Sequence, residues 1–276
     1  MPEGPEIRRA ADRIQKALAG RRLQSVFFAF DVLRPWCERL RGEAVAAVDT
    51  VGKHMLIRFD DGTRIYSHNQ LYGRWFVRPR DQLPDTGRSL RLALHTRTHS
   101  ALLYSASAID VIPEEAISSD HRLAGLGPDP LHPDLRPARV RARLLDARYR
   151  RRALAGLLLD QGFFAGLGNY LRSEILYAAG VHPAHRPIDC SDNQLTALAQ
   201  AILYLPRRSY RTGGITNDPA LVRRLRQRGI PREALRFKVF GRAGEACYQC
   251  GVSIQRSTVG GRRAYHCPVC QPDCNV

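Results

Sequence analysis

Residues 157–176 read LLLDQGFFAGLGNYLRSEIL, and this stretch decides the architecture of the second half of the chain. Apolar residues stand at helical spacing on both sides of a turn that contains Gly162, Gly166 and Gly168. The pattern predicts a helix, a double turn and a second helix that starts near Asn169. The start of that helix offers unpaired backbone N–H groups, where a phosphate group can bind. An N-cap role for Asn169 and tight helix packing at the glycines are the alternative explanations.

The rest of the chain separates into segments of different periodicity. Residues 5–19 carry apolar side chains at three- and four-residue spacing and end at Gly20, which predicts an amphipathic helix. Residues 22–112 consist of short β-rich runs separated by Asp-Gly and Pro/Gly turns, which favours a β-sandwich or a barrel. Prolines and glycines interrupt the pattern over residues 113–135, as in a linker, and helical spacing follows.

The last stretch of the chain contains four cysteines in the pattern C-x2-C-x16-C-x2-C. Two thiolate pairs, one at each end of a hairpin, match the tetrahedral coordination of zinc by four sulfurs. Because the set is closed and lacks a histidine, we predict one structural Zn2+ rather than a catalytic one. Four buried free thiols or two disulfides are the alternatives. The predicted ligands are Cys247, Cys250, Cys267 and Cys270, and the cysteines expected to be ordinary thiols are Cys37, Cys190 and Cys274.

These segments predict an α+β protein with several domains. The chain has 276 residues, which is enough for two ordinary domains and a small module. We expect residues 1–125 to form a β-sandwich with a leading helix. Residues 126–234 are expected to form a helical domain with a helix-two-turns-helix motif, and residues 235–276 a zinc-finger β-hairpin.

The charge of the chain favours a polyanionic partner. Forty-three Lys and Arg stand against 26 Asp and Glu, a formal charge of +17, and such an excess supplies affinity for nucleic acid. Residues 136–152 alone hold eight Arg and one Asp, and residues 205–242 hold eleven basic and two acidic residues. The alternative is an Arg-rich background, since only three of the basic residues are Lys. In such a background, a Lys indicates a position where Arg cannot serve.

No feature of the sequence indicates a membrane. No apolar run approaches the roughly 18 residues of a membrane span. The N-terminal run MPEGPEIRRA has acidic residues and prolines where a signal peptide has an apolar core. We therefore expect a cytoplasmic protein.

The N-terminus and one lysine have the residue types for covalent chemistry. Removal of Met1 leaves Pro2 with a secondary amine of pKa about 8, which can attack an aldehyde-like carbon and form an iminium. Glu3 beside it can move protons. Lys53, in a turn that enters a predicted strand, can give and take a proton where Arg cannot. A plain helix lead-in and chance retention of the lysine are the alternatives.

A polar and aromatic tip lies between two β runs. Residues 67–73 read SHNQLYG. Gln70, Leu71 and Tyr72 on such a loop are suited to wedge into a base stack.

Together, and in this order, the motifs resemble those of the formamidopyrimidine-DNA glycosylase family. The shared runs extend from residue 1 to about residue 271. They are MPEGPEIRRAADRI, the Gly-Lys pair at 52 and 53, YSHNQLYG, GPDPL, RRALAGLLLDQGFFAGLGNYLRSEIL, RFKVFGRAGEAC and the four cysteines. The SHNQLYG and RFKVF runs resemble the branch that acts on oxidised pyrimidines. The resemblance implies a bifunctional DNA glycosylase and abasic-site lyase of base excision repair that binds damaged duplex DNA, as a monomer.

The resemblance also implies catalytic roles. Pro2 is expected to be the nucleophile that forms a Schiff base, and Glu3 the general acid and base. Lys53 matches the proton donor of β-elimination, and Arg262, five residues before the third zinc ligand, matches the arginine of δ-elimination.

The DNA-contacting positions of the family can be matched in the same way. Asn169 matches an asparagine that contacts the DNA backbone, and Gln70, Leu71 and Tyr72 match the residues that fill the space of the extruded nucleotide. A basic residue often lies two positions before the G-P-D turn in the family, and this chain has Gly125 there, with Arg122 as another source of the charge.

Two other functions remain open at this point. One is a glycosylase for purine lesions (formamidopyrimidine or 8-oxoguanine), because base preference in the family is linked to the region that here spans residues 212–234. The other is a non-catalytic zinc-finger protein that binds distorted DNA.

Overall fold

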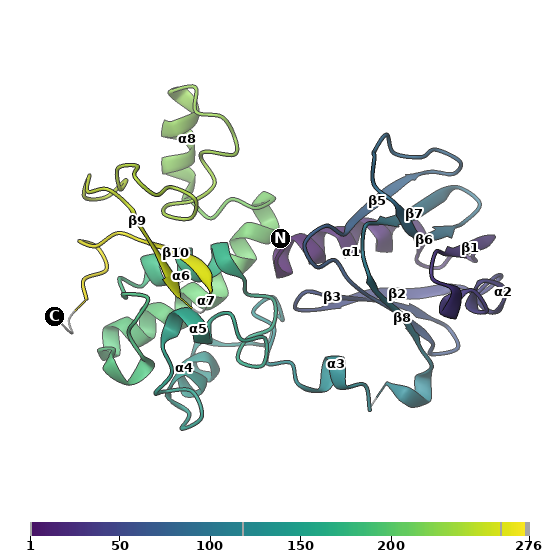
Figure 1. Cartoon of the computed structure of the whole chain (residues 1–276), viewed down its shortest axis with the longest axis horizontal. Coiled ribbons are helices and arrows are strands. Elements are labelled where there is room, and N and C mark those ends of the chain that lie inside the picture. The colour runs from purple at the N-terminus through teal and green to yellow at the C-terminus, as the bar shows by residue number, and fades with distance from the viewer. Residues whose placement is uncertain (1, 118, 260, 274–276) are drawn as a thin grey trace. The chain divides into compact units, whose positions relative to one another are not determined.

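The computed structural model describes residues 2–117, 119–259 and 261–273. Cys274, one of the cysteines expected to be an ordinary thiol, lies outside these residues. The chain forms two compact units, Met1–Gly125 and Leu126–Val276 (Figure 1). Each unit has a hydrophobic core of its own.

The first unit begins with helix α1 (Gly4–Leu18), which confirms the predicted amphipathic helix. Glu3 is its N-cap, and Pro5 stands in the first turn, where a missing N–H costs nothing. The apolar positions of α1 are buried in the unit's core, and the chain leaves the helix at Gly20 with a φ of +72°.

Two four-stranded antiparallel sheets form the predicted sandwich, so the barrel alternative is excluded for this unit. The core between them is made by inward-facing residues of both sheets and of α1. One sheet has the strand order β1 (Ser25–Phe28), β6 (Leu90–His95), β7 (His99–Tyr104) and β5 (Arg74–Pro79). The other has the order β2 (Val45–Val51), β3 (His54–Phe59), β4 (Arg64–His68) and β8 (Ala108–Ile112).

Short helices complete the first unit. They are η1 (Asp31–Leu33), α2 (Trp36–Arg39), η2 (Glu114–Ala116) and α3 (His121–Ala124). The last two lie in the stretch that the sequence analysis treats as a linker.

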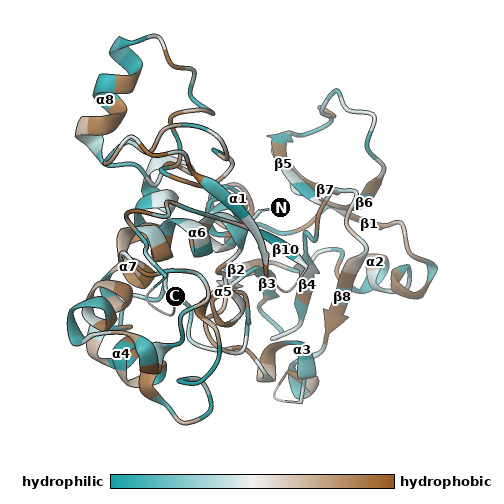
Figure 2. Ribbon diagram, turned by 60° about the vertical axis from the view of Figure 1, so that its left-hand side comes forward, coloured by the Kyte–Doolittle hydropathy of each residue, from teal (hydrophilic) through white to brown (hydrophobic). Residues whose placement is uncertain are grey.

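The second unit contains the predicted helix-two-turns-helix. Its helices are α4 (Pro137–Leu145), α5 (Leu154–Leu157), α6 (Asn169–Ala178), η3 (Pro187–Asp189), α7 (Asp192–Thr212) and α8 (Pro219–Gln227). Figure 2 shows brown and teal segments alternating along α4 and α8, as in helices with one apolar face. The double turn between α5 and α6 is buried, with Phe163, Phe164 and Leu167 in the core.

Gly127, in the GPDP run, has to be a glycine because of this double turn. A Cβ at Gly127 would lie 2.5 Å from the backbone oxygens of Gly162 and Phe163. The backbone N–H of Gly127 donates to the carbonyl of Gln161, and that of Ala165 to the carbonyl of Pro128. The GPDP run therefore stabilises the turn between α5 and α6 through hydrogen bonds and close packing.

Strands β9 (Gln255–Val259) and β10 (Arg262–His266) form the predicted C-terminal hairpin. Its base shares a small core with the helical part of the unit, and this core includes Tyr177 of α6, Val239, Ile254 and Cys267. Among the described residues, no helix is long and apolar enough to cross a lipid bilayer.

Candidate active site and metal centre

The residues at the start of α1 are held in a rigid turn. The backbone N–H of Glu3 donates to Glu6 Oε2 at 3.0 Å, and the carbonyl of Glu3 accepts from the N–H groups of Glu6 and Ile7. Glu3 is only 3 % exposed, whereas Pro2 beside it is half-buried. The helix start thus orders the backbone from Glu3 onward and places a buried carboxyl group directly after Pro2 in the chain.

Lys53 lies in a two-residue turn between β2 and β3, as the sequence predicts. The turn is closed by the pairing of Val51 with His54, and Gly52 supplies the left-handed conformation with a φ of +59°. Lys53 is 7 % exposed. A lysine that is this deeply buried is uncommon unless a partner or a reaction requires it.

Two histidines beside Lys53 were missed by the sequence analysis. Nδ1 of His54 lies 2.8 Å from the hydroxyl of Tyr66, and the rings of His54 and His68 are 4.9 Å apart. Burial lowers the pKa of His54 to about 4, with further lowering from His68 and Lys53. Burial and Lys53 lower the pKa of His68 as well. Both imidazoles are therefore neutral at neutral pH.

The loop between β4 and β5 presents an exposed apolar tip on a fixed base. The backbone N–H of Gln70 donates to His68 Nδ1 at 3.1 Å, and the Ser107 hydroxyl donates to the Gln70 side chain. Gln70 takes a φ of +50°, which is uncommon outside glycine. Leu71 and Tyr72 are 57 % and 68 % exposed. This arrangement suits insertion of the two side chains into a stack of bases.

Gly125 has no side chain to contact DNA, and a Cβ there would meet nothing within 4 Å. Arg122 is not a free replacement for the missing charge. Its guanidinium group forms ion pairs with Asp110 and Asp120 and lies over the ring of Tyr66. The charge of Arg122 is therefore neutralised within the first unit.

Asn169 is the first residue of α6, and its side chain does not cap the helix, because the N-cap is Gly168. Its Nδ2 donates to the carbonyl of Arg263 at 2.9 Å, and Nη2 of Arg172 donates to the same oxygen at 2.8 Å. Arg172 is completely buried. The start of α6 and the hairpin strand β10 are thus joined into one surface.

Arg262 lies at the first position of β10, paired with Val259 of β9, and is exposed. Arg256 and Arg263 on the same hairpin are exposed as well. The hairpin therefore presents three guanidinium groups to solvent.

The four predicted ligand cysteines lie together. Their Sγ atoms are all within 4.8 Å of one another, and Cys247 to Cys270 and Cys250 to Cys267 are 3.9 and 3.4 Å apart. Tetrahedral Zn–S bonds of about 2.3 Å require S–S separations of about 3.8 Å. The four thiols therefore fit a single metal ion. Cys37 and Cys190 are free and half-buried, as expected.

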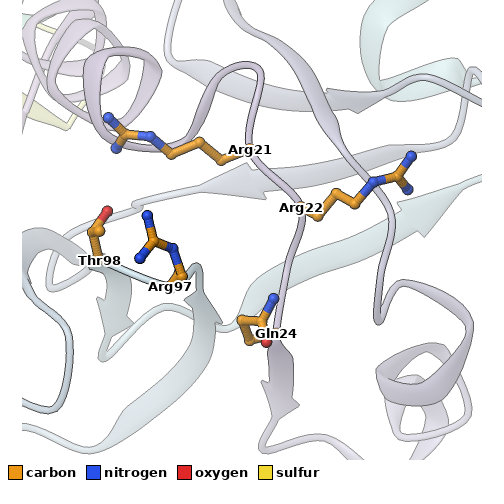
Figure 3. A pocket seen from close by; sticks show the side chains of 5 residues that line it. All are labelled: Arg21, Arg22, Gln24, Arg97 and Thr98. Atoms are coloured by element: carbon orange, nitrogen blue, oxygen red, sulfur yellow. The ribbon is translucent and has the colours of Figure 1, made fainter.

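A further cavity of about 270 Å³ opens in the first unit (Figure 3). It is lined by Arg21, Arg22, Gln24, Arg97 and Thr98. None of the predicted catalytic or DNA-binding residues lines it.

Comparison with known proteins identifies the class. Residues 1–107 match the family model of the formamidopyrimidine-DNA glycosylase N-terminal domain, and residues 126–219 match the H2TH domain of the same family. The chain belongs to the formamidopyrimidine-DNA glycosylase family.

Its similarity within the family lies with endonuclease VIII, as the sequence motifs predict. It is 46 % identical to Endonuclease 8 of Salmonella enteritidis PT4 over 271 residues, which is 98 % of this chain and all of that protein. Endonuclease 8 of Klebsiella pneumoniae has the same identity and coverage. The chain is thus similar over its whole length to a DNA glycosylase with abasic-site lyase activity, and it is an enzyme of base excision repair that binds damaged DNA.

Solved structures confirm the fold. The Lactococcus lactis Fpg protein, in complex with DNA that contains N7-benzyl-Fapy-dG, has a TM-score of 0.81 to this chain at 22 % identity, and the match covers 99 % of this chain and all of that one. The same protein in complex with DNA that contains an oxidised pyrimidine has a TM-score of 0.80 at 21 % identity, with the same coverage.

Proposed function

We propose that this enzyme removes oxidised pyrimidines from duplex DNA and then cuts the strand by β,δ-elimination, with the nitrogen of Pro2 as nucleophile. The observation that carries the proposal is the burial of Glu3 and Lys53 in the unit that holds Pro2 at a rigid helix start. Ionisable side chains that are buried from solvent in this way are typical of sites of acid–base catalysis. The similarity to Endonuclease 8 supports pyrimidine lesions as the substrate class.

In the proposed reaction, the Pro2 nitrogen attacks C1′ of the damaged nucleotide. Glu3 assists opening of the sugar ring and the base leaves, so that an iminium joins Pro2 to the sugar. The iminium acidifies the proton on C2′. Its loss allows the bond to the 3′ phosphate to break, with Lys53 as proton donor, and a second elimination assisted by Arg262 breaks the bond to the 5′ phosphate.

The damaged nucleotide has to leave the base stack before Pro2 reaches C1′. We assign Gln70, Leu71 and Tyr72 to the space that it leaves, because the loop presents two exposed apolar side chains on a fixed base. Asn169 and the hairpin bind the DNA backbone. Weak pairing at the lesion lowers the free-energy cost of extrusion.

The metal of the four cysteines is, in this proposal, one structural Zn2+ that fixes the Arg262 hairpin. Four thiolates without an open position are typical of structural zinc. We propose three functional divisions of the chain, with a catalytic part at 1–125, a helical part at 126–234 and the zinc finger at 235–276. The enzyme acts where the chromosome lies, in the cytoplasm.

The substrate class is tested by cleavage of paired duplexes that carry thymine glycol, 5-hydroxyuracil, 8-oxoguanine or a plain abasic site. We expect the two pyrimidine lesions to be cut faster than 8-oxoguanine, with products of both eliminations. In Arg262→Ala the β-product should accumulate while base release continues. Faster cutting of 8-oxoguanine would assign the enzyme to purine lesions, and tight binding without any cutting would mark a non-catalytic DNA-binding protein.

A further inference from the structure

A second group of metal-ligating side chains lies in the second unit, separate from the four cysteines. It consists of His182 and His185, in the segment that follows α6, and Asp273, in the C-terminal segment. Their potential ligand atoms all lie within 4.8 Å of one another. None of the three has a role in the proposed glycosylase reaction.

The two histidine–aspartate distances in this group are close to those in the coordination shell of one ion. Asp273 Oδ2 lies 3.7 Å from Nδ1 of His182, and Asp273 Oδ1 lies 3.4 Å from Nε2 of His185. For Zn–N and Zn–O bonds of about 2.0–2.1 Å, tetrahedral geometry places neighbouring ligand atoms about 3.4 Å apart. The two separations in this group, 3.7 and 3.4 Å, are close to this value. They are longer than charge-assisted hydrogen bonds, which are about 2.7–2.9 Å.

The surroundings hold the group in place. His185 is 3 % exposed, and His182 and Asp273 are half-buried. The fully buried Gln271 donates to the carbonyl of Val181 at 2.8 Å, so the C-terminal segment is fixed beside the histidines.

A third histidine adjoins the group. The ring of His266 lies 4.9 Å from that of His182 and perpendicular to it. Nδ1 of His266 is buried and has no hydrogen-bond partner among the described residues. Buried polar atoms are normally paired, and a bound ion or water is one standard explanation for an exception.

We propose that His182, His185 and Asp273 bind a second divalent metal ion of the zinc type, which clamps the segment after α6 to the C-terminal segment. Two imidazoles and one carboxylate are ligands that Zn2+ and its neighbours in the first transition row accept. The chain then binds two metal ions, one with sulfur ligands only and one with nitrogen and oxygen ligands only. This second site is independent of the proposed glycosylase reaction.

Metal analysis of the untagged full-length protein, loaded with zinc and then freed of weakly bound ions, tests the proposal. We expect two equivalents of zinc in the wild type and one in Asp273→Asn. Asp134→Asn is the matched control. Asp134 lies 3.9 Å from one exposed histidine, His132, in the same unit, and this pair lacks the second histidine of the proposed site. This variant should keep two equivalents.

Loading with Co2+ separates the two sites by their spectra. Only the cysteine site gives sulfur-to-cobalt charge-transfer absorption, so this band should be equal in the wild type and in Asp273→Asn. The visible d–d absorption should fall in Asp273→Asn, and an intact sulfur band shows that the variant is folded. One equivalent of metal in the wild type, or a second equivalent that Asp273→Asn retains, would overturn the proposal.

Discussion

At the scale of single residues, the burial of Glu3 and Lys53 supports their proposed roles in proton transfer. Charged side chains are rarely buried without a partner or a chemical role, and both are more than nine-tenths buried in the first unit. Residue type and family resemblance alone predict a catalytic role for both. Their burial adds a physical reason, because a group removed from water has a pKa that its surroundings can adjust for proton transfer.

Glu3→Gln keeps the size of the side chain and removes its proton chemistry. We expect base release to slow by about 10²- to 10⁴-fold, the usual contribution of a general acid or base. Single-turnover cleavage of a pyrimidine-lesion duplex measures this rate. Glu6→Gln is the matched control, since Glu6 supplies the other carboxyl group of the same helix turn. An equal loss in both variants would assign the effect to the helix start rather than to Glu3.

His54 predicts a pH dependence of stability. Its pKa is about 4 in the folded protein and 6.5 in an ordinary environment, mainly because burial disfavours the charged form. Between these pH values the unfolded chain binds more protons than the folded one, so this contribution to stability is lost as pH falls from 6.5 towards 4.

The prediction is checked by urea unfolding at a series of pH values and by NMR titration of the imidazole. His54→Gln should reduce the dependence between pH 6.5 and 4, while His68, whose pKa is also lowered, keeps part of it. A His54 resonance that titrates near 6.5 in the folded protein would contradict the assignment.

The elements show which parts of the fold the sequence could predict. Helix α1, the sandwich, the double turn and the zinc hairpin follow from periodicity, glycines and cysteine spacing. Strand β8 lies at the end of the predicted β-rich segment 22–112, although AIDVI is short and has no clear alternation. Helix α7 continues to Thr212 through Pro206, although proline normally ends or kinks a helix. Leu205, Pro206 and Ser209 are buried at this point of the helix.

Helix α8 was missed because three arginines obscure its apolar face, yet Leu221, Val222 and Leu225 form a small core with Leu235. Long-range contacts of the site were also beyond prediction. Nothing in local sequence indicates that Asn169 donates to a carbonyl 94 residues away. The pairing of His54 with His68 likewise depends on the register of β3 and β4.

Gly73 tests how the loop between β4 and β5 is built. A Cβ there would lie 2.5 Å from the backbone oxygen of Asn69, which accepts from the N–H of Gly73. We expect Gly73→Ala to lower the free energy of unfolding by about 1–3 kcal/mol, the usual cost of overpacking. Gly87→Ala is the control, because its Cβ would meet nothing within 4 Å. Chemical denaturation of both variants measures the difference in the free energy of unfolding. Equal stability would show that the loop backbone shifts to accept the added methyl group at no cost.

At the level of the whole molecule, the charge of +17 suits a protein that binds DNA. The Arg-rich segments 136–152 and 205–242 belong to the second unit, which also contains the exposed arginines of the hairpin. Some of this charge is structural. Arg143 and Arg207 donate to backbone carbonyls, and Arg208 does so from a buried position.

Loss of the cysteine metal should uncouple the hairpin from the rest of the second unit. We expect Cys247→Ser to lose one equivalent of zinc and most of its affinity for lesion DNA, because the base of the hairpin shares its core with Cys247 and Cys267. Metal content and the Kd for an abasic-site duplex measure both effects. Cys37→Ser, at a free cysteine of the first unit, should change neither. Unchanged DNA affinity in metal-free Cys247→Ser would show that the hairpin needs no metal.

The central claim is that the nitrogen of Pro2 forms the covalent bond to DNA. Borohydride reduction during reaction with an abasic-site duplex, followed by mass spectrometry of the protein's peptides, locates that bond directly. The account predicts a stable adduct with the sugar remnant on Pro2, in a chain from which Met1 has been removed. An adduct on Lys53, or no adduct from a protein with a free Pro2 that still cuts the strand, would contradict it.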